Sequence, residues 1–143
     1  MKTEPETFSI DDLERVGTEP WTGVRNYMAR NHMREMQVGD GVLFYHSSCE
    51  EPGIAGLAEV ASAAYPDPTQ FERSSPYYDP KAKKDDPRWF HVDVRALKKT
   101  RLVPLAELRR RKPLAKMVLL RPGNRLSITP VTEGEWTYIG KLV

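Results

Sequence analysis

The alternation of apolar and polar positions predicts several extended segments. Gly41–Ser47 (GVLFYHS) is apolar and aromatic almost throughout, which is typical of a buried strand. Ile54–Ala61 follows the turn residues Glu50–Gly53, so we expect it to pair antiparallel with the first segment. Trp89–Leu97 alternates strictly between apolar and polar positions, and Arg125–Val131 is also predicted to be extended.

Helix signals lie between and after these strands. Ser9 is a good N-cap and Gly17 a good stop, so a helix is predicted between them. A second helix is predicted from near Val24 to Met36. Pro104 opens a short helix that runs to Arg111. Thr132 with Glu135 three residues later forms a capping box for a last helix. The inward face of the second helix is expected to consist of Tyr27, Met28, His32 and Met36.

These elements predict one α+β domain over residues 1–143. Several short strands in antiparallel order favour a small mixed or antiparallel β-barrel with peripheral α-helices. Gly56, inside the second strand, indicates a close backbone approach or a bend. The proline-rich stretch Tyr65–Pro87 is predicted to be a long loop, and such loops are often functional.

Composition restricts the cellular compartment and the kinds of partner that the chain can have. The single cysteine, Cys49, excludes an intrachain disulfide and suits a reducing cytoplasm, or a nucleus in a eukaryote. No apolar run approaches the ~20 residues of a membrane span. The net charge is only +2, but basic residues dominate from Arg101 to Arg125. This segment is either a solvated surface or a face that follows a phosphate backbone, with Arg109, Arg110, Arg111 and Lys112 as the candidate contacts.

Catalytic and metal-binding patterns are missing from the sequence. His32, His46 and His91 have no neighbouring ligands at metal spacing, so neither a metal site nor a cofactor is predicted. No nucleophile elbow, phosphate loop or dinucleotide fingerprint occurs. Cys49 lacks an evident base and oxyanion site, which favours a loop thiol over a nucleophile. The chain is therefore not expected to be an enzyme.

The segment Trp21–Tyr27 (WTGVRNY) concentrates groups suited to recognition. An indole can stack on a nucleobase or hold a methylated cation, and the Asn26 carboxamide offers a donor and an acceptor to a base edge. The alternative is structural, with a buried Trp21 at one end of the barrel and Arg25 and Asn26 joining loops. The residues alone leave both interpretations open.

Longer motifs give the chain a family resemblance. Lys2–Pro5 (KTEP) resembles the K-S-E-P of EVE domains, and Trp21–Asn31 resembles their W-x-G-V-R-N-Y-Q-A-R-N. Further matches follow in the family's order over nearly the whole chain: Val38–Ser47, Pro52–Val60, Ala64–Asp67, Tyr77–Pro80 and Pro87–Val94. The family also includes the thymocyte nuclear proteins. It usually has an apolar strand before K-S-E-P, so a weaker barrel seam is expected beside Met1.

The resemblance implies a PUA-like β-barrel related to the YTH domain and a non-catalytic module that holds a modified nucleobase of DNA or RNA. Membrane partners are not expected, and a monomer is favoured. The implied ligand-binding residues are Lys2, Thr3, Glu4, Trp21, Arg25, Asn26, Tyr27, Tyr45, His46, Ser47, Tyr78 and Trp89. Two alternatives remain. An enzyme or accessory protein acting on modified nucleotides or RNA would need an acid/base pair such as Glu4 with His46. A small-molecule-binding or structural partner protein would not need an acid/base pair.

Overall fold

The computed structural model describes all residues from 1 to 143. Its strands are β1 Lys2–Thr3, β2 Thr18–Pro20, β3 Gly41–His46, β4 Gly53–Val60, β5 Tyr65–Pro66, β6 Phe90–His91 and β7 Asp93–Pro104. Its α-helices are α1 Ile10–Val16, α2 Tyr27–Glu35, α3 Leu105–Arg110 and α4 Glu133–Gly140. Short 3-10 turns cover Pro68–Phe71, Lys112–Leu114 and Val118–Leu120.

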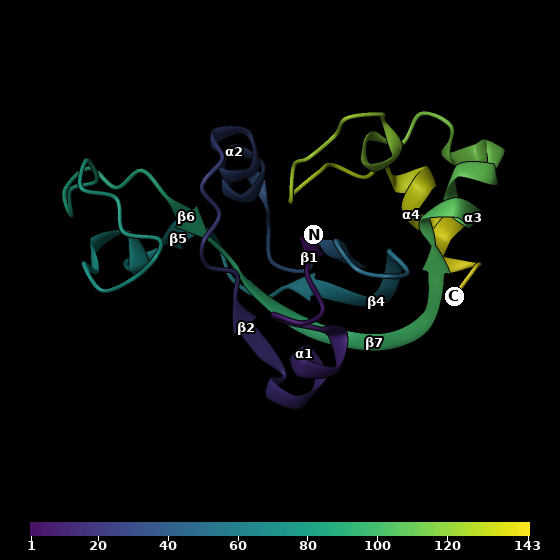
Figure 1. The fold of residues 1–143 in the computed structure, drawn as a ribbon, viewed down its shortest axis with the longest axis horizontal. Helices are drawn as coiled ribbons and strands as arrows, with labels where there is room; N and C mark the ends of the chain where they lie inside the picture. Colours follow the sequence, from purple (N-terminus) through teal and green to yellow (C-terminus); the bar gives the residue numbers. More distant parts are fainter.

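Five strands form one curled sheet in the order β1-β3-β4-β7-β2. β1 pairs parallel with β3, and the other neighbours pair antiparallel. The long strand β7 sweeps beneath the molecule and bends sharply upward at its end, so the sheet has the shape of a half-barrel (Figure 1). The α+β class is therefore confirmed, with a half-barrel sheet.

Two apolar clusters lie on opposite faces of this sheet. Val42 and Phe44 of β3 belong to one cluster, whereas Leu43 and Tyr45 belong to the other. Successive side chains of a strand point to opposite faces, so a strand covered on both faces is apolar throughout. This explains why β3 shows no alternation in the sequence.

Helix α1 lies against the sheet in close contact. Its Ser9 capping box is present, and Gly17 ends it with a φ of 82°. A Cβ at Gly56 of β4 would come within 2.5 Å of the Ile10 side chain. That Cβ would also lie 3.0 Å from the Lys98 carbonyl oxygen of β7, so the close backbone approach predicted at Gly56 is present, in addition to the contact with α1.

Three sequence predictions about elements were wrong. The extended strand predicted at Arg125–Val131 is irregular coil. The carbonyl of Ser127 accepts one bond, from the Lys2 amide (2.8 Å), and Pro130 has no N–H, so no ladder forms. Helix α2 begins at Tyr27 rather than near Val24, because the Asn26 side chain caps it by accepting from the Ala29 amide (3.1 Å).

The predicted inward stripe of α2 was also wrong. Tyr27 and Met28 are 50% and 60% exposed, whereas Ala29 and Met33 are buried. Tyr27 lies outside the core because its ring stacks on Trp89, with centroids 4.8 Å apart and planes 23° apart. The core face of α2 is thus set by small and flexible residues, which the hydrophobic pattern did not single out.

Candidate nucleobase-binding site

A pocket of about 410 Å³ opens where the start of β1, the end of β2 and the segment after β2 meet. Trp21, Thr22, Gly23, Val24 and Arg25 form one wall. The rest of its lining is contributed by Lys2, Thr3, Thr7, Phe8, Glu19, Pro20, Tyr77 and Ser127. The pocket therefore collects residues from five separate stretches of the chain.

Trp21 forms a rigid aromatic base for this pocket. It is 9% exposed and lies between the rings of Phe8 and Phe44, which approach it edge-on at 6.3 and 5.7 Å. Its main chain is fixed by a bond from its amide to the Val92 carbonyl (2.9 Å). A residue held in this way presents a preorganised surface to a ligand and loses little entropy on binding.

Gly23 and Tyr77 close one side of the pocket through a contact that requires glycine. Gly23 has a φ of 82°, and a Cβ there would lie 2.6 Å from the Tyr77 ring. Tyr77 itself is 42% exposed. An exposed aromatic ring seated on a backbone turn can cover a ligand or stack on one.

Asp67 anchors this wall from inside the protein. It is fully buried, and its Oδ2 accepts from the Gly23 amide (2.9 Å) and from Arg25 Nη1 (3.2 Å). Its Oδ1 accepts from the Thr69 amide (2.8 Å) and hydroxyl (2.5 Å). Burial alone would raise the pKa of Asp67, but these hydrogen bonds outweigh burial and hold the pKa below its ordinary value. A buried carboxylate therefore balances the charge of Arg25.

The Arg25 guanidinium donates its hydrogen bonds to other groups of the protein. Nε and Nη2 donate to the Tyr77 carbonyl (3.1 and 2.8 Å), and Nη2 also donates to the Thr69 hydroxyl (3.0 Å). Nη1 donates to the Val24 carbonyl (3.0 Å) as well as to Asp67. Since a guanidinium has five N–H groups, all of them are engaged. Arg25 thus positions the wall and supplies positive charge, without a free donor for a ligand.

The structure brings only part of the predicted set into the pocket. Lys2, Thr3, Trp21 and Arg25 line it. Asn26 caps α2, Tyr45 is buried in the second apolar cluster, and Ser47 and Tyr78 make main-chain bonds outside the lining. Trp89 is 6% exposed, covered by Tyr27 and Arg25, and its Nε1 donates to Asp79. The remaining members of the predicted set that do not line the pocket are Glu4, Tyr27 and His46.

The hypothetical Glu4–His46 pair is not formed. His46 Nε2 accepts from the Ile10 amide (3.1 Å) at the start of α1, and Glu4 is exposed. Burial lowers the pKa of His46, consistent with a neutral ring that acts as an acceptor. His46 thus stabilises the start of α1, and Glu4 faces the solvent.

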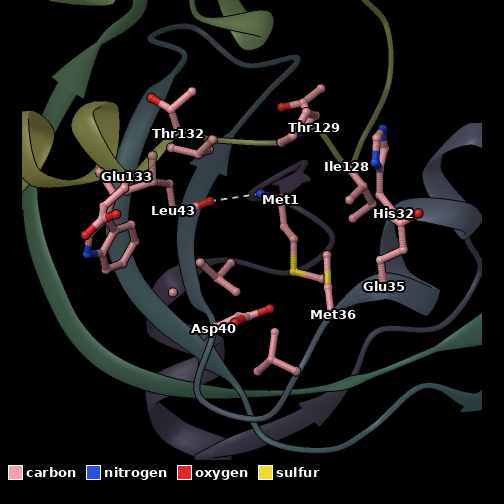
Figure 2. Close-up of a pocket in the computed structure, with 16 residues that line it drawn as sticks. Met1, His32, Glu35, Met36, Asp40, Leu43, Ile128, Thr129, Thr132 and Glu133 are labelled. Atoms are coloured by element: carbon pink, nitrogen blue, oxygen red, sulfur yellow. Dashed lines mark hydrogen bonds between the residues drawn. The ribbon is translucent and has the colours of Figure 1, made fainter.

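A second and larger cavity, of about 560 Å³, lies beside the start of β1 and β3. Figure 2 shows Met1 and Met36 reaching into it and the Met1 amine donating to the Leu43 carbonyl (2.9 Å). Its charged lining side chains are Glu35, Asp40 and Glu133, with neither lysine nor arginine among them. Three carboxylates repel a phosphate backbone, so the Trp21 pocket is the better nucleic-acid site.

The candidate phosphate contacts at the end of α3 lie away from the Trp21 pocket. Figure 1 places α3 at the opposite end of the molecule from the loop that carries Tyr77. Arg109 and Arg110 are exposed, whereas Arg111 Nη2 pairs with Glu107 (2.8 Å). No helix of the chain is long and apolar enough to cross a membrane.

Comparison with known proteins identifies the family. The family model described as the EVE domain matches residues 1–142. The chain belongs to the EVE family. Thymocyte nuclear protein 1 of Homo sapiens is 45% identical over 159 residues, which span 97% of this chain and 70% of the relative.

Solved structures of other members superpose on the EVE chain closely. A protein of Pseudomonas syringae has a TM-score of 0.95 at 44% identity, covering 99% of this chain and 96% of that chain. Human thymocyte nuclear protein 1, in a complex with DNA containing 5-methylcytosine, has a TM-score of 0.93 at 45% identity. The match covers 99% of this chain and 94% of the human chain. The half-barrel is therefore the family's fold.

Sequence reasoning missed three residues that shape the pocket. Glu19 and Tyr77 line it, and Asp67 anchors it. Asp67 belongs to the matched Ala64–Asp67 motif, and Tyr77 to the matched Tyr77–Pro80 motif, so both lay within motifs that the sequence displays. Glu19 carried no signal, since its role depends on where β2 ends.

Proposed function

We propose that this EVE chain is a non-catalytic nucleic-acid-binding module that holds a modified nucleobase in the Trp21 pocket. The observation that carries the proposal is a preorganised pocket built on the family's own motif. The human relative with the same fold at 45% identity forms a complex with DNA containing 5-methylcytosine, which supports DNA as the partner and 5-methylcytosine as the base.

The pocket has the dimensions and chemistry for one base. Its volume of about 410 Å³ lies within the range of small-ligand sites. A base must be single-stranded or flipped from a duplex to enter it, at a cost of a few kcal/mol. Aromatic stacking supplies about 1–3 kcal/mol per base, and Trp21 and Tyr77 are the aromatic residues best placed to contribute.

Positive charge beside the pocket suits the flanking phosphates. Lys2 and Arg25 both line it, and because Asp67 balances the charge of Arg25, Lys2 supplies the uncompensated charge. Lys2 Nζ makes one long contact, to the Asn124 carbonyl (3.4 Å), so its other donors can reach a ligand. Contacts of this kind position a nucleic acid without reading its sequence.

The proposed absence of catalysis rests on the same geometry. The Glu4–His46 pair that catalysis would need does not converge on the pocket, because Glu4 is exposed and the ring of His46 accepts a hydrogen bond from α1. A general acid or base must lie within hydrogen-bond reach of the reacting proton. Arg25 and Asp67 neutralise each other, and we assign the remaining charged groups of the lining, Lys2 and Glu19, to binding and orienting the base.

Removing the ring of Tyr77 tests the proposal. Tyr77→Ala should weaken binding of a single-stranded oligonucleotide carrying one 5-methylcytosine about tenfold, through the loss of aromatic contact. Tyr77→Phe is the matched control, since it keeps the ring and should bind within about twofold of the wild type. Calorimetric titration of both variants gives the comparison. Wild-type protein that binds no modified oligonucleotide, or a folded Tyr77→Ala variant with undiminished affinity, would show that the pocket is not the site.

A further inference from the structure

The charged groups still available in the Trp21 pocket form a complementary pair. Among its lining residues only Glu19 is acidic, and only Lys2 and Arg25 are basic. Arg25 has no free donor, as shown above. The pocket is therefore left with one anionic acceptor, Glu19, and one cationic donor, Lys2.

Strand β2 holds Glu19 at the mouth of the pocket. Glu19 pairs with Val94 of β7, and Pro20 and Trp21 follow it directly into the pocket wall. Its side chain is partly buried and forms no hydrogen bond or ion pair within the chain. By contrast, Asp67 pairs with Arg25, and Glu107 pairs with Arg101 and Arg111. A partly buried carboxylate without a partner is costly unless a ligand supplies a donor.

We propose that Glu19 is a specificity-determining residue that accepts a hydrogen bond from the exocyclic amine of a cytosine-type base. This rests on the proposed function of the pocket. Acidic side chains recognise cytosine through its N4 amine, which is a donor. On the same base edge, N3 and O2 are acceptors that the Lys2 ammonium can reach as a donor.

The pair rejects thymine by the same chemistry. Thymine and 5-methylcytosine carry the same methyl group at C5 and stack alike, but thymine presents the O4 acceptor where cytosine presents an amine. The Glu19 carboxylate has no proton to donate to O4, so two acceptors would face each other. Leaving a polar group unpaired in a site gives stronger discrimination than a methyl contact does.

Glu19→Gln provides a sharp test, because a carboxamide has the same shape and both accepts and donates. Wild type should bind a 12-mer single strand with one 5-methylcytosine about tenfold more tightly than the same strand with thymine. Glu19→Gln should reduce this ratio to about threefold or less, with 5-methylcytosine binding weakened and thymine binding improved. Glu51→Gln, an exposed glutamate outside the pocket, is the matched control for charge and should keep the wild-type ratio.

The outcomes separate this proposal from the one it rests on. If wild type binds neither strand, the proposed function fails. If wild type binds 5-methylcytosine but Glu19→Gln keeps the full preference over thymine, the pocket stands and the role of Glu19 is overturned. Equal wild-type affinity for the two strands also overturns it. Thermal unfolding of Glu19→Gln should match the wild type, which shows that any change in ratio is not a loss of fold.

Discussion

Replacing Asp67 with asparagine should destabilise the protein strongly, although the two side chains have the same shape. Asn offers one acceptor oxygen where Asp67 uses two. With the NH₂ toward Gly23 N–H and Arg25, it would face two donors; turned toward Thr69, it would face the Thr69 amide, while the Thr69 hydroxyl can rotate to accept from it. One or two buried hydrogen bonds are therefore lost, together with the negative charge that pairs with Arg25.

The magnitude follows from the lost hydrogen bonds and the lost charge. Hydrogen bonds to a charged group contribute about 1.5–3 kcal/mol each. Arg25 keeps 21% of its side chain exposed, so water recovers part of the loss. We therefore expect Asp67→Asn to lower the free energy of unfolding by about 3 kcal/mol. For a chain of this size this corresponds to a fall in Tm of about 10 °C.

Urea unfolding followed by tryptophan fluorescence measures the loss. Asp93→Asn is the matched control: Asp93 Oδ1 accepts from the Tyr65 hydroxyl (2.5 Å), an amide oxygen can do the same, and the loss should stay below about 1 kcal/mol. In a double-mutant cycle with Arg25→Met, the two substitutions should couple by about 1–2 kcal/mol. A loss below about 0.5 kcal/mol for Asp67→Asn, or purely additive effects, would refute the idea that Asp67 holds the pocket wall.

Three further predictions test other parts of the structure. Burial lowers the pKa of His91, so below pH ~6.5 the unfolded chain binds a proton that the native state does not, and stability should fall between pH 6.5 and 5. His91→Leu should flatten this fall in denaturant titrations across that range, and an unchanged slope would contradict it. Gly23→Ala should lower Tm and weaken base binding, because an alanine at this position must adopt a φ of 82° and its Cβ displaces the Tyr77 ring. The expected loss of stability is about 1–2 kcal/mol. An unchanged Tm and affinity would show that the contact between Gly23 and Tyr77 does not matter. If α3 contacts phosphates, Arg110→Gln should reduce the salt dependence of binding, measured as the slope of log K against log salt concentration, by about one unit or less. Arg111→Gln should reduce it less, because Arg111 is already paired with Glu107. Slopes identical to wild type would show that this face is only solvated.

Local signals predicted the parts of the fold that local forces decide. β3 and β4 were expected within a residue or so of their observed ends, because an apolar run bounded by glycine turns has few alternatives. The N-cap at Ser9 and the capping box at Thr132 were found because an N-cap residue and its partner lie within one turn of the chain. The strand predicted at Arg125–Val131 was wrong because an extended propensity does not supply a partner strand, and only Ser127 forms a main-chain hydrogen bond with another segment.

The site was predictable where a residue's own chemistry was unusual. Trp21 and Arg25 were singled out by their neighbours in one short segment. Tyr77 and Asp67 reach the pocket wall only because the segment between β5 and β6 folds back over it, and the matched motifs do not reveal that contact. Conversely, Trp89 was chosen for its ring, but its faces and its N–H are already occupied within the protein. Composition identifies residues capable of recognition, whereas tertiary contacts decide which of them remain free.

Blocking each cavity in turn shows which of the two holds the nucleobase. Ser127 lines the Trp21 pocket, and Thr129, on the same irregular segment, lines the larger cavity beside Met1. Ser127→Trp and Thr129→Trp therefore place the same indole in one cavity or the other. We predict that Ser127→Trp weakens binding of an oligonucleotide carrying 5-methylcytosine at least about tenfold, while Thr129→Trp binds within about twofold of wild type. If Thr129→Trp abolishes binding and Ser127→Trp does not, the base occupies the other cavity and the account is wrong.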